Sequence, residues 1–145
     1  MGKLASVQEF IQTHCIHVMC ITETHLLPSM PDSFIHIPNF RIIRNDVSAK
    51  VPKHGVCTYI HANLKFDCVD ISFKNVISFC LPELKVFVAA VYRPPSYTPH
   101  DNDALLTHLT NFCTSREVII LGDFNLPSLS WDTSITSYVN CQPIR

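Results

Sequence analysis

The chain has 145 residues, of which 47% are hydrophobic, so it is long and apolar enough to form one globular domain with a substantial core. Its formal charge of -1 provides no overall basic field, and contact with nucleic acid would therefore need a local basic patch. No apolar run approaches the roughly 20 residues of a membrane helix, and polar residues interrupt residues 1–12, which disfavours a signal peptide. The 7 cysteines lack the spacing of a zinc module or a disulfide scaffold, so we expect mostly buried thiols in an intracellular, reducing compartment.

The first predicted elements are a helix and a buried strand. Leu4, Val7 and Ile11 recur at helical spacing, which predicts a short amphipathic helix. The apolar run at residues 16–21 follows and is typical of a strand inside a sheet. Its polar continuation carries Glu23, and a carboxylate at the point where a strand leaves its sheet is well placed for chemistry.

A series of β-rich segments comes next, separated by polar or proline-containing turns. They lie at residues 41–44, 56–60, 66–73, 76–81 and 84–92, a pattern that predicts a meander of sheet strands. Prolines end the last of these strands. Asp101 or Asn102 is then expected to cap a second helix, whose apolar face runs to Cys113.

The last predicted strand, at residues 118–121, is a short apolar run of the kind that is buried on both faces of a sheet. Gly122 ends it, and Asp123 and Asn125 come directly after. Asp123 and Glu23 thus both follow predicted buried strands, so they could converge at one sheet edge although they are far apart in sequence. Carboxylates placed in this way can hold a hard cation, which largely meets the needs of phosphodiester hydrolysis.

Four stretches of the sequence resemble the endonuclease/exonuclease/phosphatase superfamily, and most closely the endonuclease domains of non-LTR retrotransposons. The first is Ile-Ile-Leu-Gly-Asp-Phe-Asn-Leu-Pro at residues 119–127, with Ser130-Trp131-Asp132 just after it. The others are residues 21–26 around Glu23, residues 91–95 around Tyr92, and Arg44-Asn45-Asp46 with the glycine-led strand at residues 55–60. These stretches occur in the order of the family and span nearly the whole chain.

The resemblance implies an α/β (α+β) fold that is part of a four-layer α/β/β/α sandwich. This chain would hold mainly one mixed β-sheet with flanking helices. The implied activity is that of a metal-dependent endonuclease, which hydrolyses phosphodiester bonds of DNA with Mg²⁺ or Mn²⁺.

The resemblance also implies a role for each matching residue. Glu23 and Asp123 would lie at the metal ion, and Asp123 would orient or deprotonate the attacking water. Asn125 would hold Asp123 and a phosphate oxygen, while Tyr92 would donate a hydrogen bond to the phosphate. Arg44 and Arg93 would contact the nucleic-acid backbone, since a guanidinium pairs well with phosphate.

Two features of the superfamily have no counterpart in the sequence, namely a first strand that bears an asparagine and a late Asp-His pair. We therefore expect residues 1–145 to form one incomplete domain with weak hydrolysis, because loss of one transition-state donor typically costs about 10² to 10³ in rate. The alternative is a catalytically inactive remnant, derived from a retrotransposon, that keeps residual nucleic-acid or metal binding. A third interpretation is a small-molecule phosphatase, which the same superfamily includes.

Several of these residues also have an ordinary structural interpretation, which the sequence leaves open. Tyr92 could be a half-buried strand residue. Arg93 could be a solvated residue ahead of Pro94, and residues 44–46 could form a polar turn.

Several histidines are candidate metal ligands as well. Residues 14–20 hold four potential zinc ligands, but the alternation of a strand would send them to opposite faces, which favours core packing. His25 lies beside Glu23 in the sequence and could enter the metal site. His54 stands where the family commonly has a glycine, and we assign it no catalytic role.

Overall fold

The computed structural model describes residues 3–46, 54–70 and 72–126. The first half of the chain forms α1 (Lys3–Thr13), β1 (Val18–Thr22), a 3-10 helix η1 (Asp32–Ile35), β2 (Phe40–Asn45) and β3 (Val56–His61). The second half forms β4 (Asp67–Asp70), β5 (Val76–Leu81), β6 (Val86–Tyr92), α2 (Pro99–Cys113) and β7 (Val118–Asp123). These elements follow the predicted order, and β5 has the predicted bounds.

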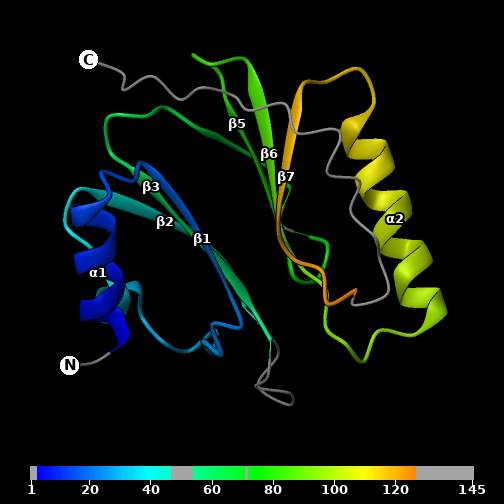
Figure 1. Cartoon of the computed structure of the whole chain (residues 1–145), viewed down its shortest axis with the longest axis horizontal. Coiled ribbons are helices and arrows are strands. Elements are labelled where there is room, and N and C mark those ends of the chain that lie inside the picture. Colours follow the sequence, from blue (N-terminus) through cyan, green and yellow to red (C-terminus); the bar gives the residue numbers. More distant parts are fainter. Residues whose placement is uncertain (1–2, 47–53, 71, 127–145) are drawn as a thin grey trace.

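The strands form two sheets that pack face to face. The first sheet has the order β1-β3-β2 and is antiparallel, and the second has the order β4-β5-β6-β7, in which β6 and β7 are parallel. Helix α1 covers the outer face of the first sheet and α2 that of the second (Figure 1). The α/β sandwich is therefore confirmed, whereas the expectation of mainly one sheet is wrong. Alternating apolar residues mark a strand but do not tell which strand it pairs with.

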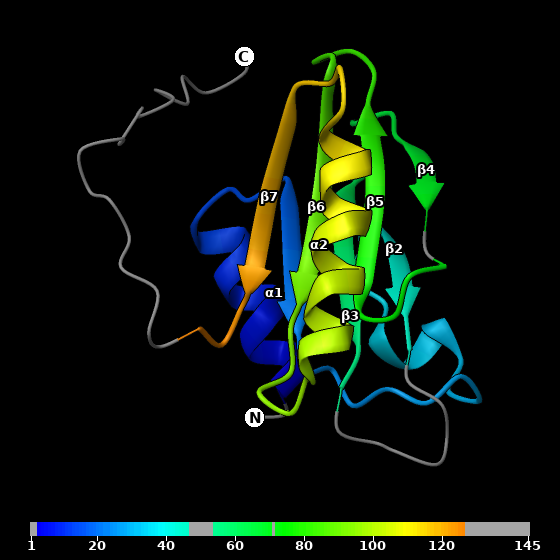
Figure 2. The same ribbon diagram turned by 90° about the vertical axis from the view of Figure 1, so that its right-hand side faces the viewer.

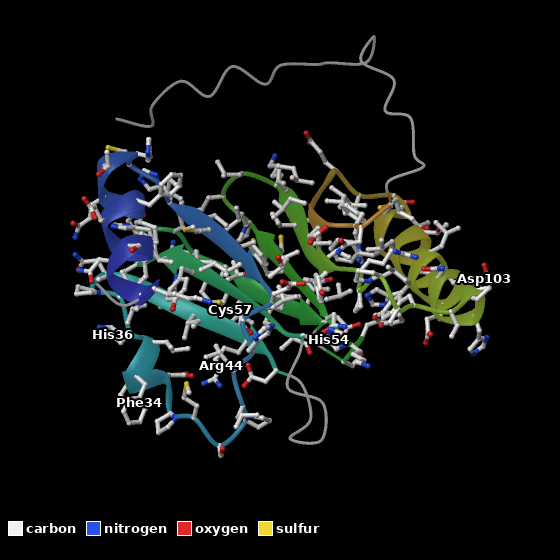
Figure 3. All side chains as sticks on the ribbon, turned by 60° about the horizontal axis from the view of Figure 1, so that its bottom comes forward. Phe34, His36, Arg44, His54, Cys57 and Asp103 are labelled. Carbon is white, nitrogen blue, oxygen red and sulfur yellow. The ribbon has the colours of Figure 1, made fainter. Side chains whose placement is uncertain are left out.

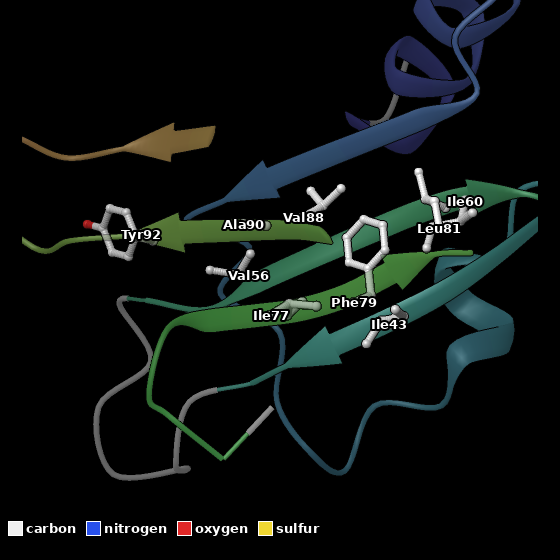
Figure 4. Close-up of a cluster of buried hydrophobic side chains, with 9 residues drawn as sticks. All are labelled: Ile43, Val56, Ile60, Ile77, Phe79, Leu81, Val88, Ala90 and Tyr92. Carbon is white, nitrogen blue, oxygen red and sulfur yellow. The ribbon is translucent and has the colours of Figure 1, made fainter. Parts of the chain in front are cut away.

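Three hydrophobic clusters hold the four layers together. The largest lies between the sheets and contains Ile43, Val56, Ile60, Ile77, Phe79, Leu81, Val88, Ala90 and Tyr92 (Figure 4). A second packs α1 against the first sheet, and a third packs α2 against the second. Strand β3 belongs to two of these clusters, since successive side chains such as Val56 and Cys57 point to opposite faces.

Strand β7 departs from the prediction of a strand buried on both faces. Ile119 is 51% exposed and Ile120 is 39% exposed. Within the part of the chain that the structure describes, β7 pairs with β6 alone and forms an edge of the second sheet. The apolar run predicts a strand correctly, but its burial depends on neighbours that periodicity does not reveal.

The cap of α2 is also corrected. Thr98, rather than Asp101 or Asn102, is the N-cap residue, and it forms a capping box with Asp101. The Thr98 hydroxyl accepts from the Asp101 amide at 3.2 Å, while the Asp101 carboxylate accepts from the Thr98 amide at 2.9 Å. Pro99 then occupies the first helical turn, where its missing N–H costs nothing.

The cysteines are less buried than expected. Cys15, Cys20, Cys57, Cys68, Cys80 and Cys113 are free thiols, and of these only Cys57 is buried. Cys141 lies outside the described residues. Neither of the two described α-helices is long and apolar enough to cross a membrane.

Candidate active site

Three strands end at the same end of the sandwich and bring the predicted site residues with them. Tyr92 is the last residue of β6 and Asp123 the last of β7, and the parallel register sets these two opposite each other. Figure 2 shows β6 and β7 running side by side to this end. Glu23 follows β1 of the other sheet, so residues from both sheets meet here.

The hydroxyl of Tyr92 joins the two sheets. It donates a hydrogen bond to Oε1 of Glu23 at 2.5 Å. Burial raises the pKa of Tyr92 to about 12, and the bond and charge of Glu23 and the charge of Asp123 act in the same direction. Both carboxylates therefore act on one buried hydroxyl, while they themselves lie exposed to solvent.

The segment that carries Glu23 has an unusual backbone. Glu23 and His25 have φ values of 52° and 53°, in the left-handed region that side chains disfavour. Neighbouring hydrogen bonds fix this shape, because the Thr24 amide donates to the Gly55 carbonyl and the His25 amide to the His54 carbonyl. Strained conformations of this kind cluster at functional sites, where the surrounding structure stabilises them.

The loop after β7 holds Asp123 in a defined turn. Oδ1 of Asp123 accepts from the backbone amide of Asn125 at 3.1 Å, and Asn125 has a φ of 46°. The side-chain amide of Asn125 donates instead to the carbonyl oxygen of Arg93 at 3.1 Å. Asn125 therefore contacts Asp123 through its main chain, not through its side chain.

Gly122 allows β7 to reach this position. Its φ is 149°, and a Cβ atom there would lie 1.8 Å from the carbonyl oxygen of Val91. Only glycine therefore permits the close approach of β7 to β6 that sets Asp123 beside Tyr92.

Arg93 and Arg44 are both bonded inside the chain. Arg93 donates through Nη1 to the carbonyl oxygens of Phe124 and Asn125 and through Nε to Asn102. Arg44 lies on β2, beside the loop that carries η1 (Figure 3). Its N–H groups donate to the carbonyls of Leu27 and Met30 and to the carboxylates of Asp32 and Asp46.

The sequence matches one known family, and the fold resembles that of several solved structures. Residues 86–144 match the model of a family described as endonuclease-reverse transcriptase. The fold is similar to that of an AP endonuclease from Archaeoglobus fulgidus, with a TM-score of 0.61 and 14% identity over 85% of this chain and 52% of that one. The chain has the fold of the endonuclease/exonuclease/phosphatase superfamily.

Further similar structures fit the same superfamily. An AP endonuclease from Leishmania major has a TM-score of 0.54 and 16% identity over 78% of this chain and 40% of that one. A humanized TDP2 from D. rerio has a TM-score of 0.56 and 10% identity over 85% of this chain and 55% of that one. The chain thus spans about half the length of these superfamily structures. No curated protein matches it in sequence.

Two residues at this end of the sandwich escaped the sequence analysis. Asn75 is buried, accepts from the Gly55 amide at 3.3 Å through Oδ1, and accepts from the Tyr92 amide at 2.9 Å through its carbonyl. It therefore ties the starts of β3 and β5 to the end of β6. A lone asparagine between two strands gives no signal of such a role, since turns commonly contain asparagine.

His54 is the second residue that the sequence analysis missed. Its ring centroid lies 5.7 Å from that of Tyr92, so it packs at the site although the sequence suggested only an altered loop. Figure 3 shows it at this end of the sandwich. His25, whose place in the site the sequence left open, lines an open pocket of about 490 Å³ together with Glu23, beside α1.

The donors at this end suit a particular class of metal. No three His, Cys, Asp or Glu side chains of the described ranges gather as a metal cage. Glu23 and Asp123 remain as two exposed carboxylates around one hydroxyl. Mg²⁺ is typically held by one or two carboxylates, with waters and substrate phosphates as further ligands, so the pair fits that ion. Zinc, which takes three or four protein ligands, fits less well.

Proposed function

We propose that this chain is part of a Mg²⁺- or Mn²⁺-dependent endonuclease that hydrolyses phosphodiester bonds of DNA. The observation that carries the proposal is the hydrogen bond of Tyr92 to Glu23 at the point where Asp123 ends β7. One neutral donor and two carboxylates at one solvent-exposed edge are the groups that binding and attack of a phosphodiester require.

Each residue has a defined role in this reaction. Glu23 would hold the metal ion, which when bound offsets the charge of the phosphate and of the leaving oxygen. Asp123 would orient the attacking water and take its proton, and the Asn125 amide keeps that carboxylate in place. Tyr92 is protonated at neutral pH even at the ordinary tyrosine pKa of 10.0, and its raised pKa reinforces this, so its hydroxyl would donate to a phosphate oxygen once it turns from Glu23.

DNA is proposed as the substrate on two grounds. The segment at residues 86–144, which carries Tyr92 and Asp123, matches a family described as endonuclease-reverse transcriptase. Two of the similar structures are AP endonucleases. A retrotransposon type of endonuclease agrees with the first of these, and we propose the nucleus or cytoplasm as its place of action.

A plasmid-nicking assay with and without Mg²⁺ tests the proposal. The chain is expected to convert supercoiled to open-circular DNA only with the metal, and Asp123→Asn should lower the rate by at least about 10²-fold. Asp103→Asn is the matched control, since it removes the same charge from an exposed position on α2 far from His54 (Figure 3). Equal nicking by both variants would refute the proposal.

Binding measurements and a panel of small phosphate esters, run beside the nicking assay, separate the alternatives. A wild-type chain that folds and binds Mn²⁺ or DNA but never nicks would be a catalytically inactive remnant. Hydrolysis of inositol phosphates or other small phosphate esters without nicking would identify a small-molecule phosphatase.

A further inference from the structure

Arg93 lies where three elements of the second half of the chain meet. Its Nη1 donates to the carbonyl oxygens of Phe124 at 3.2 Å and of Asn125 at 3.0 Å, both in the loop after β7. Its Nε donates to Oδ1 of Asn102 on α2 at 2.8 Å. The guanidinium therefore connects the helix to the loop that carries Asp123.

The main chain of Arg93 contacts the same loop. Its amide donates to the carbonyl of Asp123 at 2.8 Å, and its own carbonyl accepts from the Asn125 side chain at 3.1 Å. Pro94 follows, is buried, and restricts Arg93 to an extended backbone. Main chain and side chain of Arg93 thus both bond to residues 123–125.

The other end of the connection is also fixed. Asn102 lies in the first turn of α2, and its amide donates to the carbonyl of Thr98, the residue whose capping box with Asp101 defines the start of the helix. A rigid helix end therefore presents Oδ1 of Asn102 to Arg93. Arginine suits this position because its rigid planar guanidinium presents donors on separate nitrogens to acceptors on two different elements, whereas lysine has a single nitrogen on a flexible stem.

We infer that Arg93 is a positioning residue, which sets the carboxylate of Asp123 through the loop at residues 123–125 and is itself set by Asn102. This inference rests on the proposed function. It assigns the guanidinium to the loop, because two of its three nitrogens, Nε and Nη1, already have acceptors there and on α2. Direct contact with DNA phosphate is the competing interpretation.

Mn²⁺ affinity distinguishes the two interpretations by the sign of the effect. Arg93→Ala removes a positive charge near two carboxylates, which by charge alone would tighten Mn²⁺ binding. A positioning role predicts the opposite, an increase of about 10-fold in the Mn²⁺ dissociation constant, as is usual when support for a metal ligand is lost. Binding is measured by the relaxation of water protons around Mn²⁺, and this requires no turnover.

The matched control is Arg116→Ala. Arg116 also lies against the second half of the chain, over the rings of Phe87 and Phe112, and its removal changes the net charge equally. The Mn²⁺ dissociation constant should stay within about 2-fold of wild type, since in the described part of the chain the Arg116 guanidinium contacts Phe87 and Phe112 and not the loop after β7. A similar loss in both arginine variants would point to general destabilisation.

Asn102 provides a milder test that leaves Arg93 in place. Asn102→Ala removes the acceptor of Nε and should weaken Mn²⁺ binding by about 3-fold or more, whereas Asn102→Asp keeps an acceptor and should restore it. In nicking assays, Arg93→Ala and Asn102→Ala should each have a lower kcat than wild type and an unchanged KM for DNA. A phosphate contact would instead raise KM for Arg93→Ala and reduce the salt dependence of DNA binding.

The outcomes separate this inference from the proposed function. Loss of Mn²⁺ binding in Glu23→Gln and Asp123→Asn with normal binding in Arg93→Ala and Asn102→Ala would overturn the positioning role alone. If wild type binds no Mn²⁺, the proposed function fails. Hydrogen exchange of the Asn125 amide then tests the positioning role of Arg93 by itself. That exchange should be about 10-fold faster in Arg93→Ala and Asn102→Ala at equal global stability, and an unchanged rate would overturn the inference.

Discussion

The Tyr92 hydroxyl donates to the Glu23 carboxylate across the interface of the two sheets, between residues 69 positions apart in the chain. Tyr92 is 2% exposed, whereas Glu23 is exposed. A buried donor thus reaches an exposed acceptor, and the carboxylate can be rehydrated when this bond is lost, whereas the buried hydroxyl requires another acceptor.

Tyr92→Phe is expected to lower the free energy of unfolding by about 1 kcal/mol, because one hydrogen bond is lost while the Glu23 carboxylate can be rehydrated. Urea denaturation measures this change. If Tyr92 donates to the phosphate, the activation free energy calculated from the nicking rate should rise by more than the free energy of unfolding falls. Phe79→Leu, a change in the core between the sheets, is the control that should lower stability more than activity.

Stability should fall as the pH rises from about 10 to about 12, partly because of Tyr92. Its folded pKa of about 12 exceeds its ordinary value of 10.0, so the folded state holds the proton longer than the unfolded chain. The contribution is fully present below pH 10 and disappears as the pH passes the folded pKa. Denaturation curves across this range should show a shallower decline for Tyr92→Phe, and an identical decline would contradict the assignment.

The contacts of Arg44 predict a graded effect on stability. Arg44→Met should cost about 3 kcal/mol, since it leaves Asp46 without its partner at a position where both side chains are largely buried, 12% and 11% exposed. Asp46→Asn should also be costly. Asp32→Asn should cost less than about 1 kcal/mol, because Asp32 is 64% exposed.

Urea denaturation of these three variants tests the ranking. Equal effects of Asp32→Asn and Asp46→Asn would contradict it. The salt dependence of DNA binding should also be the same in Arg44→Met as in wild type, if its N–H groups stay bonded inside the chain.

Gly122→Ala should destabilise the chain by at least about 2 kcal/mol, because its Cβ atom cannot coexist with the carbonyl of Val91 and the backbone has a positive φ. The displacement of β7 should also move Asp123 and weaken Mn²⁺ binding. Leu106→Ala, at a 65% exposed position on α2, should change stability by less than about 0.5 kcal/mol. A tolerated alanine at position 122 would mean that β7 pairs with β6 less closely than described.

Ile119→Lys should reduce concentration-dependent self-association. Ile119 is 51% exposed on a strand that forms a sheet edge, and such edges pair with other chains unless a charge prevents it. Light scattering over a concentration series measures the effect. Leu106→Lys introduces the same charge on a helix and should leave the association unchanged.

The sequence predicts the bounds of a strand well where both of its faces are buried. It predicts them poorly where the bounds depend on pairing with one neighbouring strand. Residues 76–81 are predicted with the observed bounds, because both faces of β5 are packed and every position is apolar or small. The segment predicted at residues 66–73 corresponds to the shorter β4, whose pairing with β5 contains a register shift between Cys68 and Asp70. Pairing is a long-range property, so neither the shift nor the division into two sheets is visible in a local pattern.

The site shows the same division. The sequence predicts Glu23, Tyr92, Asp123 and Asn125 as site residues. The ends of β1, β6 and β7, which carry the first three, do meet. The acceptors of Arg93 and Arg44 could not be predicted, since most are main-chain carbonyls in loops, which any residue provides equally well. Asn75 was missed because its bonds depend on where β3 begins and where β6 ends.

The site also depends on the packing of one sheet on the other. Glu23 belongs to the first sheet and Tyr92 and Asp123 to the second, and each sheet keeps its own hydrogen bonds if the two slide apart by a small distance. Such a displacement would separate the carboxylates while the secondary structure stays intact. The close packing of the core between the sheets therefore keeps Glu23 at the Tyr92 hydroxyl.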